Sequence, residues 1–284
     1  MWCLLLLLIR TPAPAADLDA RVHKLIAASG AEVAVAMRTF DGSRELFIDP
    51  DKPFHAASTM KVPIMIELFR QAEAGPLRLD EPLPIKNEFH SIVDGSVYQL
   101  SVGDDSDAAV YRHVGSTMSL RDLCEAMITV SSNFAANLLI ERVGAEHVRQ
   151  TVHRLGADGM IVLRGVEDQK AFDQGMNNQT TARALEVLLL KLAQGKAVSA
   201  RADAEMVAVL KRQTFHDAIP AGLPDGTVVA HKTGNITKIH HDAAIVYGPR
   251  PYVLVVLVRG IEDQQVSGAL IASISREVWT YLEK

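Results

Sequence analysis

Ser58 and Lys61 are the first residues whose types and spacing suggest covalent chemistry. The serine precedes the lysine by three positions at the start of a predicted helix, which places both side chains on one helical face. A neighbouring lysine lowers the cost of deprotonating a serine hydroxyl, and backbone N–H groups at a helix start face developing negative charge. The pair is therefore a candidate nucleophile and proton acceptor. Taken alone, it is more often a helix cap followed by a solvated lysine.

Two further motifs carry residues of the same kind. Ser131-Ser132-Asn133 falls in a predicted connection between helices, and His231-Lys232-Thr233-Gly234 falls on a predicted strand. Each has an ordinary structural interpretation, as a capped turn and as a strand end with an exposed lysine. Together, in this order on helix, helix connection and strand, the motifs favour nucleophilic serine chemistry, because two lysines would stabilise serine alkoxides.

The elements that must position these motifs are segregated along the chain. Helical periodicity dominates from Ser58 to Lys211, and strand patterns lie before and after this stretch. The predicted strands are 32–39, 44–48, 227–232, 241–247 and 252–259, and helices are predicted at 18–28 and 266–282. We expect an α+β fold with one antiparallel five-stranded sheet flanked by helices. An α/β lobe would comprise residues 17–57 and 212–284, a helical lobe residues 58–211, and the cleft between them would bind the ligand.

Composition excludes several other classes of protein. The chain has 284 residues, of which 48% are hydrophobic and 22% charged, so it is neither disordered nor a polytopic membrane protein. Its net charge of -5, without a basic stripe, argues against nucleic acid as the main partner.

The N-terminus resembles an export signal. An apolar run from Leu4 to Ile9 precedes the small residues 13–16, which predicts removal of residues 1–16; a misassigned start is the alternative. Cys124 would then be the single cysteine of residues 17–284, so no internal disulfide is expected.

The three motifs resemble the S-x-x-K, S-x-N and K-T-G set of the serine β-lactamase and penicillin-binding-protein superfamily. Ser131 to Leu139 is similar to the S-D-N-x-A-A-N-L-L helix of class A β-lactamases, and residues 75–80, 119–124 and 180–182 match other segments. The resemblance extends from about residue 18 to the C-terminus. It implies a β-lactamase/transpeptidase-like fold and an exported, periplasmic or secreted bacterial enzyme. It further implies that the enzyme opens β-lactams through an acyl-serine intermediate. We expect a monomer with no cofactor, no metal and no stable membrane insertion after signal removal.

The same resemblance assigns roles in catalysis. Ser58 would be the nucleophile, Lys61 its proton acceptor (directly or through water), and Ser131 the donor of a proton to the departing lactam nitrogen. The oxyanion hole would consist of the backbone N–H groups of Ser58 and Asn235. The substrate itself would be held by Asn133, Lys232, Thr233, Gly234 and Asn235, with Asn133 on the acylamino side chain and Lys232 and Thr233 on the carboxylate.

The stretch that begins at Arg164 departs from the class A pattern. Those enzymes carry R-x-E, whose glutamate activates the deacylating water, whereas Glu167 comes one position later. Glu167 can act as that base only if a local bulge or register shift brings it to the water. Gln179 replaces the aspartate that clasps the arginine, so we expect the loop to be anchored through Asn177 and Asn178.

This departure leaves a second function open. Without a working base the enzyme would stay acylated, and it would then be a D,D-peptidase-like penicillin-binding protein or an esterase. A non-turnover sensor or penicillin-binding module is a further alternative, although the complete set of Ser58, Lys61, Ser131 and Lys232 argues against an inactive scaffold.

Five other positions have their own interpretations. His240 and His241 cannot easily chelate one metal ion, because adjacent strand residues point to opposite faces. His231 is interpreted as a strand neighbour rather than a base, and Lys238 as a possible second carboxylate contact. The family position that pairs with Cys124 is Met65 in this sequence, which predicts a free, buried thiol.

Overall fold

The computed structural model describes residues 15–284. Residues 1–14, which contain most of the predicted signal segment, lie outside the described residues. Within residues 15–284, no helix combines the length and the apolar character that a membrane span requires.

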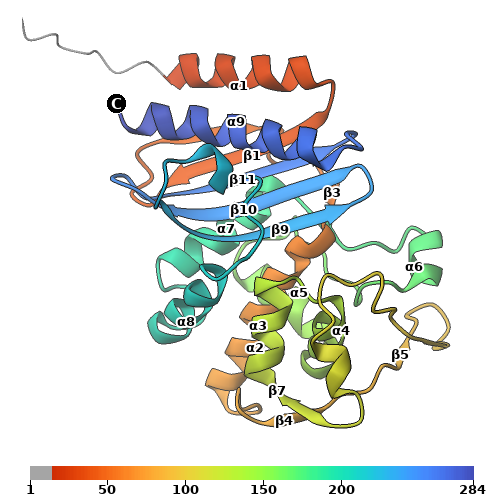
Figure 1. The fold of residues 1–284 in the computed structure, drawn as a ribbon. Helices are drawn as coiled ribbons and strands as arrows, with labels where there is room; N and C mark the ends of the chain where they lie inside the picture. The colour runs from red at the N-terminus through yellow and green to blue at the C-terminus, as the bar shows by residue number, and fades with distance from the viewer. Residues whose placement is uncertain (1–14) are drawn as a thin grey trace, which may run out of the picture.

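A five-stranded antiparallel sheet forms the centre of the fold, with strand order β2-β1-β11-β10-β9 (Figure 1). Its strands are β1 Glu32–Thr39, β2 Glu45–Ile48, β9 Val228–Ile236, β10 Ile239–Tyr247 and β11 Tyr252–Arg259. The N-terminal and C-terminal strands meet where β1 pairs with β11. The expected sheet, and the α+β class with it, is confirmed.

The sequence of β11 explains why it lies in the middle of the sheet. Val253, Val255 and Leu257 pack into the core on one face, and the residues between them, such as Leu254 and Val256, pack into the core on the other. A strand that is apolar at successive positions must be covered on both faces, whereas alternating strands tolerate solvent on one. β11 therefore connects the two hydrophobic cores.

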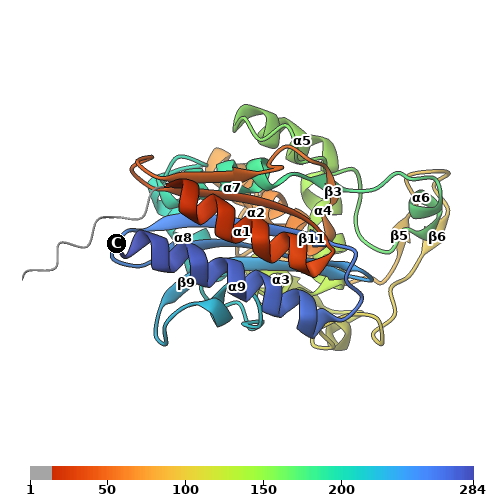
Figure 2. The same ribbon diagram turned by 90° about the horizontal axis from the view of Figure 1, so that it is seen from above.

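Helices cover both faces of the sheet. α1 (Ala15–Ser29) and α9 (Gln264–Leu282) lie side by side across one face, as Figure 2 shows from above. On the other face, α7 (Ala182–Ala193) packs against β1, β10 and β11. Although α7 falls inside the stretch 58–211, its contacts are with the sheet as well as with its helical neighbour α8.

The remaining helices surround α2 (Lys61–Ala74), most of whose side chains are buried. They are α3 Leu120–Thr129, α4 Asn133–Val143, α5 Ala145–Arg154 and α8 Ala200–Leu210. The short helix α6 Gln169–Asp173 lies apart from α2, in the loop that follows Arg164. Short 3₁₀ turns occur at η1 Ala57–Met60, η2 Val110–His113 and η3 Pro220–Gly222. Side chains of Ser119, Ser132 and Thr181 cap α3, α4 and α7, as their sequences favour.

Three short strand pairs join the loops: β3 Phe54–His55 with β8 Gln179–Thr180, β4 Pro82–Pro84 with β7 Thr117–Ser119, and β5 Phe89–His90 with β6 Val97–Tyr98. The sequence does not predict them, because two or three residues show no periodicity. The helix expected from Ser58 begins instead at Lys61, after the η1 turn. Cys124 is free and buried, as expected.

Candidate active site

Ser58 lies in the η1 turn, between the start of α2 and the edge strand β9. The close approach of β9 depends on Gly234, since a Cβ atom there would lie 3.0 Å from Thr59 Cγ2 and 3.3 Å from the Ala56 carbonyl oxygen. Ala57 adopts a left-handed backbone with φ of 44°, which reverses the chain directly before Ser58. The tertiary structure thus brings the first and third motifs into contact.

The Lys61 side chain is fully buried and bridges to the second motif. Its Nζ donates to the Ser131 carbonyl oxygen at 2.6 Å, to Ser131 Oγ at 3.2 Å and to Asn133 Oδ1 at 2.8 Å. Burial lowers the pKa of Lys61 to about 7, and the negative charges of Asp105 and Glu167 partly oppose this shift. Lys61 is therefore suited to exchange a proton near neutral pH.

Lys232 reaches the same hydroxyl from β9. Its Nζ donates to Ser131 Oγ at 3.0 Å and to the Thr233 carbonyl oxygen at 2.9 Å. Burial, and then the charge of Lys61, hold the pKa of Lys232 well below its usual range, and Asp242 acts in the opposite direction. Ser131, with a left-handed φ of 60°, stands between two buried lysine side chains.

Asp105 holds the second motif in place. Its Oδ1 accepts from the Asn133 N–H at 2.8 Å, and its Oδ2 accepts from the Phe134 N–H at 2.9 Å. A carboxylate at these positions stabilises the start of α4. The sequence analysis missed Asp105, because no local pattern links it to a helix that starts 28 residues later.

Glu167 reaches the site although it comes one position later in the sequence than the glutamate of the class A motif. Its Oε1 accepts from Asn133 Nδ2 at 2.9 Å, and its backbone has a left-handed φ of 62°. Partial burial raises the pKa of Glu167, while the hydrogen bond from Asn133 acts against that shift. The sequence analysis expects a local distortion of the backbone here, and the left-handed conformation of Glu167 is that distortion. Glu167 and Ser58 line the same cavity.

Asparagines anchor the loop that follows Arg164, as expected. Arg164 donates from one guanidinium nitrogen to Asn177 Oδ1 at 3.1 Å and from another to the Met176 carbonyl oxygen at 3.0 Å. Asn178 Oδ1 accepts from the N–H groups of Leu163 and Arg164, and its Nδ2 donates to the Arg164 carbonyl oxygen. Amide groups thus replace the expected carboxylate.

The two neighbours of Glu167 are also fixed. Asn137 accepts from the Val166 N–H at 2.6 Å and donates to the Val166 carbonyl oxygen at 3.0 Å. Asp168 caps α6 and accepts from Ser91 Oγ at 2.8 Å and the Ile92 N–H at 2.9 Å. These contacts, which sequence reasoning missed, hold the backbone on both sides of Glu167.

Two adjacent cavities meet at Ser58. One, of about 440 Å³, is also lined by Asn133, Glu167 and Asn235. The other, of about 300 Å³, is lined by Ser58, Ser131, Asn133, Thr233 and Asn235. The cleft therefore brings together all the candidate catalytic and binding side chains that face solvent, with Lys61 and Lys232 buried behind them.

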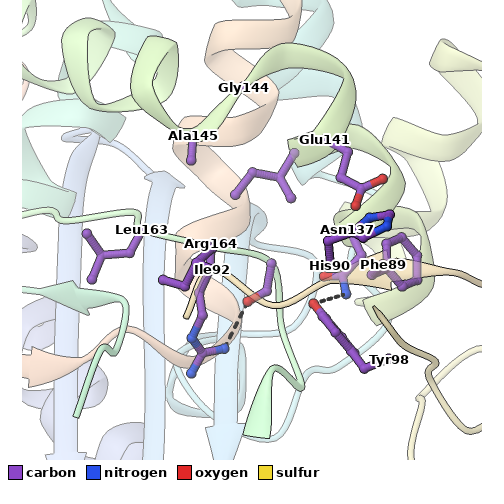
Figure 3. A pocket seen from close by; sticks show the side chains of 12 residues that line it. Phe89, His90, Ile92, Tyr98, Asn137, Glu141, Gly144, Ala145, Leu163 and Arg164 are labelled. Carbon is purple, nitrogen blue, oxygen red and sulfur yellow. Dashed lines mark hydrogen bonds between the residues drawn. The ribbon is translucent and has the colours of Figure 1, made fainter. Parts of the chain in front are cut away.

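A third cavity, of about 220 Å³, lies behind the loop, between β5, β6 and α4 (Figure 3). Tyr98 and Asn137 meet in it at 3.3 Å, and Arg164 also lines it. Neither Ser58 nor Glu167 lines this cavity, so it is not part of the candidate active site.

The histidines of β10 point apart. His240 Nδ1 lies 2.9 Å from Ser267 Oγ, and His241 Nε2 lies 2.9 Å from the His55 carbonyl oxygen on the other side of the sheet. Among residues 15–284, no group of three potential metal ligands is found. Lys238 lies 3.8 Å from Glu262 and lines neither active-site cavity.

The chain is similar to several known proteins. A sequence model of the beta-lactamase enzyme family matches residues 17–282. A beta-lactamase of Bacillus licheniformis is 32% identical over 174 residues, which span 59% of this chain and 57% of that protein. Beta-lactamase CTX-M-8 of Citrobacter amalonaticus is 29% identical over 267 residues, or 89% of this chain and 85% of that protein. The solved structure of PBP-A has 26% identity and a TM-score of 0.82, covering 96% of this chain and 99% of that one.

Proposed function

Because the chain belongs to the beta-lactamase enzyme family, it is a hydrolase acting on β-lactams, and we propose that Ser58 carries the acyl group. The observation that carries this proposal is the hydrogen-bonded series Lys61–Ser131–Lys232 beside Ser58 in one cleft. Ser58 lies in the η1 turn directly before α2, and the first residue of α2 is Lys61, a buried lysine whose pKa is lowered. The reaction divides into acylation and deacylation.

In acylation, neutral Lys61 takes the proton of Ser58, directly or through a water molecule, and Ser58 Oγ attacks the lactam carbonyl carbon. The backbone N–H groups of Ser58 and Asn235 stabilise the oxyanion. When the C–N bond breaks, Ser131 protonates the nitrogen, and Lys61 returns the proton to Ser131 through their 3.2 Å contact. Lys232, with Thr233, binds the substrate carboxylate and stabilises charge that develops on Ser131.

In deacylation, Glu167 takes a proton from the water that attacks the acyl-enzyme. Its carboxylate is directed into the cavity by Asn133. A general base must lie within hydrogen-bond reach of the proton it takes, and its raised pKa strengthens it as a base. Asn133 would in addition hold the acylamino group of the substrate.

A second function follows if Glu167 cannot hold the water. Glu167 comes one position later in the sequence than the glutamate of the family motif, and PBP-A has the same fold. A D,D-peptidase-like penicillin-binding protein or an esterase would use the same acylation machinery and release β-lactam products slowly. This function differs from the first in the lifetime of the acyl-enzyme.

The protein is further proposed to be exported to the periplasm or the medium and to act there as a monomer without stable membrane insertion. The apolar segment 4–9 and the small residues 13–16 support export. The mass of the exported chain tests this, because an uncleaved N-terminus would contradict signal removal near residue 16.

Intact-protein mass spectrometry after brief and long exposure to a penicillin and a chromogenic cephalosporin tests the function. An adduct that forms and clears while product accumulates is the expected result. An adduct that persists would favour the penicillin-binding or esterase function. If neither an adduct nor a product is detected at either time, the result would contradict both functions on β-lactams. It would point to a non-lactam ester or peptide as the substrate.

The pH dependence of acylation is expected to report Lys61. Because its pKa is lowered to about 7, Lys61 is protonated at low pH and gains base character as the pH rises through this value. Below pH 7 the acylation rate should fall roughly tenfold per pH unit. The measurement is the rate of adduct formation between pH 5 and 9, with Glu167→Gln as the control that removes the other base. A rate that does not change with pH would contradict the assignment.

A further inference from the structure

A series of hydrogen bonds through two histidines connects the sheet to the turn that carries Ser58. The Val258 N–H on β11 donates to His241 Nδ1 at 3.2 Å, and His241 Nε2 donates to the His55 carbonyl oxygen at 2.9 Å. The Ala57 N–H then donates to His55 Nδ1 at 3.0 Å. His55 ends β3, which leads into the turn before α2 (Figure 1). The acyl-serine function as argued above uses neither histidine.

The hydrogen bonds fix the tautomer of both imidazole rings. Each Nδ1 atom accepts from a backbone N–H and therefore carries no proton, so the proton of each neutral ring is on Nε2. Burial lowers the pKa of His241 to about 4, and burial followed by the positive charge of Arg164 lowers the pKa of His55. Both rings are therefore neutral at pH 7, and both Nδ1 atoms remain acceptors.

The turn before Ser58 needs these contacts because its backbone is in an unfavourable conformation. Ala57 is buried and has a left-handed φ of 44°, which a residue with a Cβ atom adopts only when its surroundings hold it there. The Ala56 N–H donates to the Asn178 carbonyl oxygen at 2.9 Å, and the Ala56 carbonyl oxygen accepts from the Thr59 N–H at 3.1 Å. For the next N–H, that of Ala57, the acceptor is the His55 ring. A buried backbone N–H that lost this acceptor would favour a different turn.

His241 supports the same segment from the sheet. It is opposite Gly234 in the β9–β10 register, so its side chain lies on the face of the sheet that the η1 turn approaches. Its ring is 0% exposed and packs edge-on against Phe54, with 5.7 Å between the ring centroids. Because β3 pairs with β8 over only two residues, the contact with His241 fixes where β3 lies relative to the sheet.

We propose that His55 and His241 are positioning residues for acylation: His241 holds the His55 carbonyl group against the sheet, and His55 Nδ1 holds the Ala57 N–H so that the turn presents Ser58 to the substrate. The proposal rests on the acyl-serine function proposed above. Neither histidine gains or loses a proton in the reaction. The turn carries both Ser58 Oγ and the Ser58 N–H, so its displacement should slow acylation. The side chains that would bind the substrate lie on other elements, so binding should change little.

The first test compares His55→Leu with His55→Asn. Leucine has no acceptor for the Ala57 N–H, whereas asparagine readily accepts from the N–H two residues later in an Asx-turn. Rapid mixing should show that His55→Leu lowers the acylation rate constant by about ten- to hundredfold, with less than about threefold change in the dissociation constant of the non-covalent complex. His55→Asn should acylate within about threefold of wild type.

This comparison also distinguishes positioning from direct contact, because His55 lines the cavity that Ser58 lines. Asparagine at this position keeps the acceptor for Ala57 but has no imidazole Nε2–H to offer a substrate. An acylation rate in His55→Asn as low as that of His55→Leu would therefore overturn the proposal. A wild-type acylation rate in His55→Leu would also overturn it.

The second test replaces His241. His241→Phe keeps a ring against Phe54 but cannot donate to the His55 carbonyl oxygen, so it should slow acylation in the same way as His55→Leu. His241→Gln can still donate an amide N–H and should retain more of the rate than His241→Phe. A wild-type acylation rate in His241→Phe would overturn the role of His241.

Asp203→Leu is the matched control for the loss of a buried acceptor. Asp203 lies on α8, is 0% exposed, and accepts from the backbone N–H groups of Ala197 and Val198. It lines neither of the two cavities that meet at Ser58. Asp203→Leu should lower the melting temperature and leave the acylation rate constant at its wild-type value. An equal loss of acylation in Asp203→Leu and His55→Leu would mean that the rate follows stability, which would overturn the proposal.

A measurement on the wild-type protein applies even if the variants do not fold. The ring ¹⁵N resonances of His55 and His241, assigned by through-bond correlation to the backbone, should show neutral rings with the proton on Nε2 at pH 7. A proton on Nδ1 of either ring at pH 7 would overturn the proposal, because that atom could not accept a backbone N–H. Absence of any adduct in the wild-type protein would instead contradict the acyl-serine function, so the two failures are distinguishable.

Discussion

Ser58→Ala is expected to abolish the covalent β-lactam adduct and to lower the hydrolysis rate by at least about 10⁴-fold. The alanine has no oxygen to attack the lactam carbonyl, and the Lys61–Ser131–Lys232 contacts do not pass through Ser58, so the cleft should stay intact. Intact mass measures the adduct, and absorbance of the opened lactam measures turnover.

Ser273→Ala provides the control for this substitution. Ser273 is a half-buried residue of α9, far from the cleft residues, that donates to the Ala269 carbonyl oxygen, so its replacement should leave adduct formation unchanged. An adduct that persists in Ser58→Ala would contradict the assignment. Ser131 would then be the next candidate, because its hydroxyl contacts both lysines.

Glu167→Gln is expected to convert a transient acyl-enzyme into one that accumulates. Glutamine preserves the shape of the side chain and a possible contact with Asn133 Nδ2, but it cannot accept a proton from water. We expect the deacylation rate to fall by about 10²–10⁴-fold while acylation changes much less. Rapid mixing followed by mass spectrometry gives the two rates separately.

Asp173→Asn is the matched control on the same loop. Asp173 is an exposed carboxylate at the end of α6 that accepts from Gln169, and its loss should not affect deacylation. Asp168 is a poor substitute for Glu167, because its oxygens already accept from Ser91, Ile92 and the start of α6. Unchanged turnover in Glu167→Gln would nevertheless place the base at a group other than Glu167.

Much of the fold and the polar centre of the site could be predicted from the sequence. The strands of the main sheet and the helices predicted at 18–28 and 266–282 have local apolar periodicity, and most of their bounds agree with the structure to within a few residues. The order of the motifs at Ser58, Ser131 and Lys232 predicts that they meet, and the structure joins them through two lysine–serine contacts. Asn177 and Asn178 could be predicted because they directly precede Gln179, which stands where the family has a carboxylate.

Only the tertiary structure shows the contacts that no local sequence pattern predicts. Asp105 looks like an ordinary polar residue in sequence, and its contacts arise only because a distant segment folds against it. The reach of Glu167 depends on its left-handed backbone and on Asn137 and Asp168, which hold its neighbours. Hydrogen bonding within a helix is set by residues close in sequence. Burial of a charge, and the resulting pKa, depends on every element that excludes water from it.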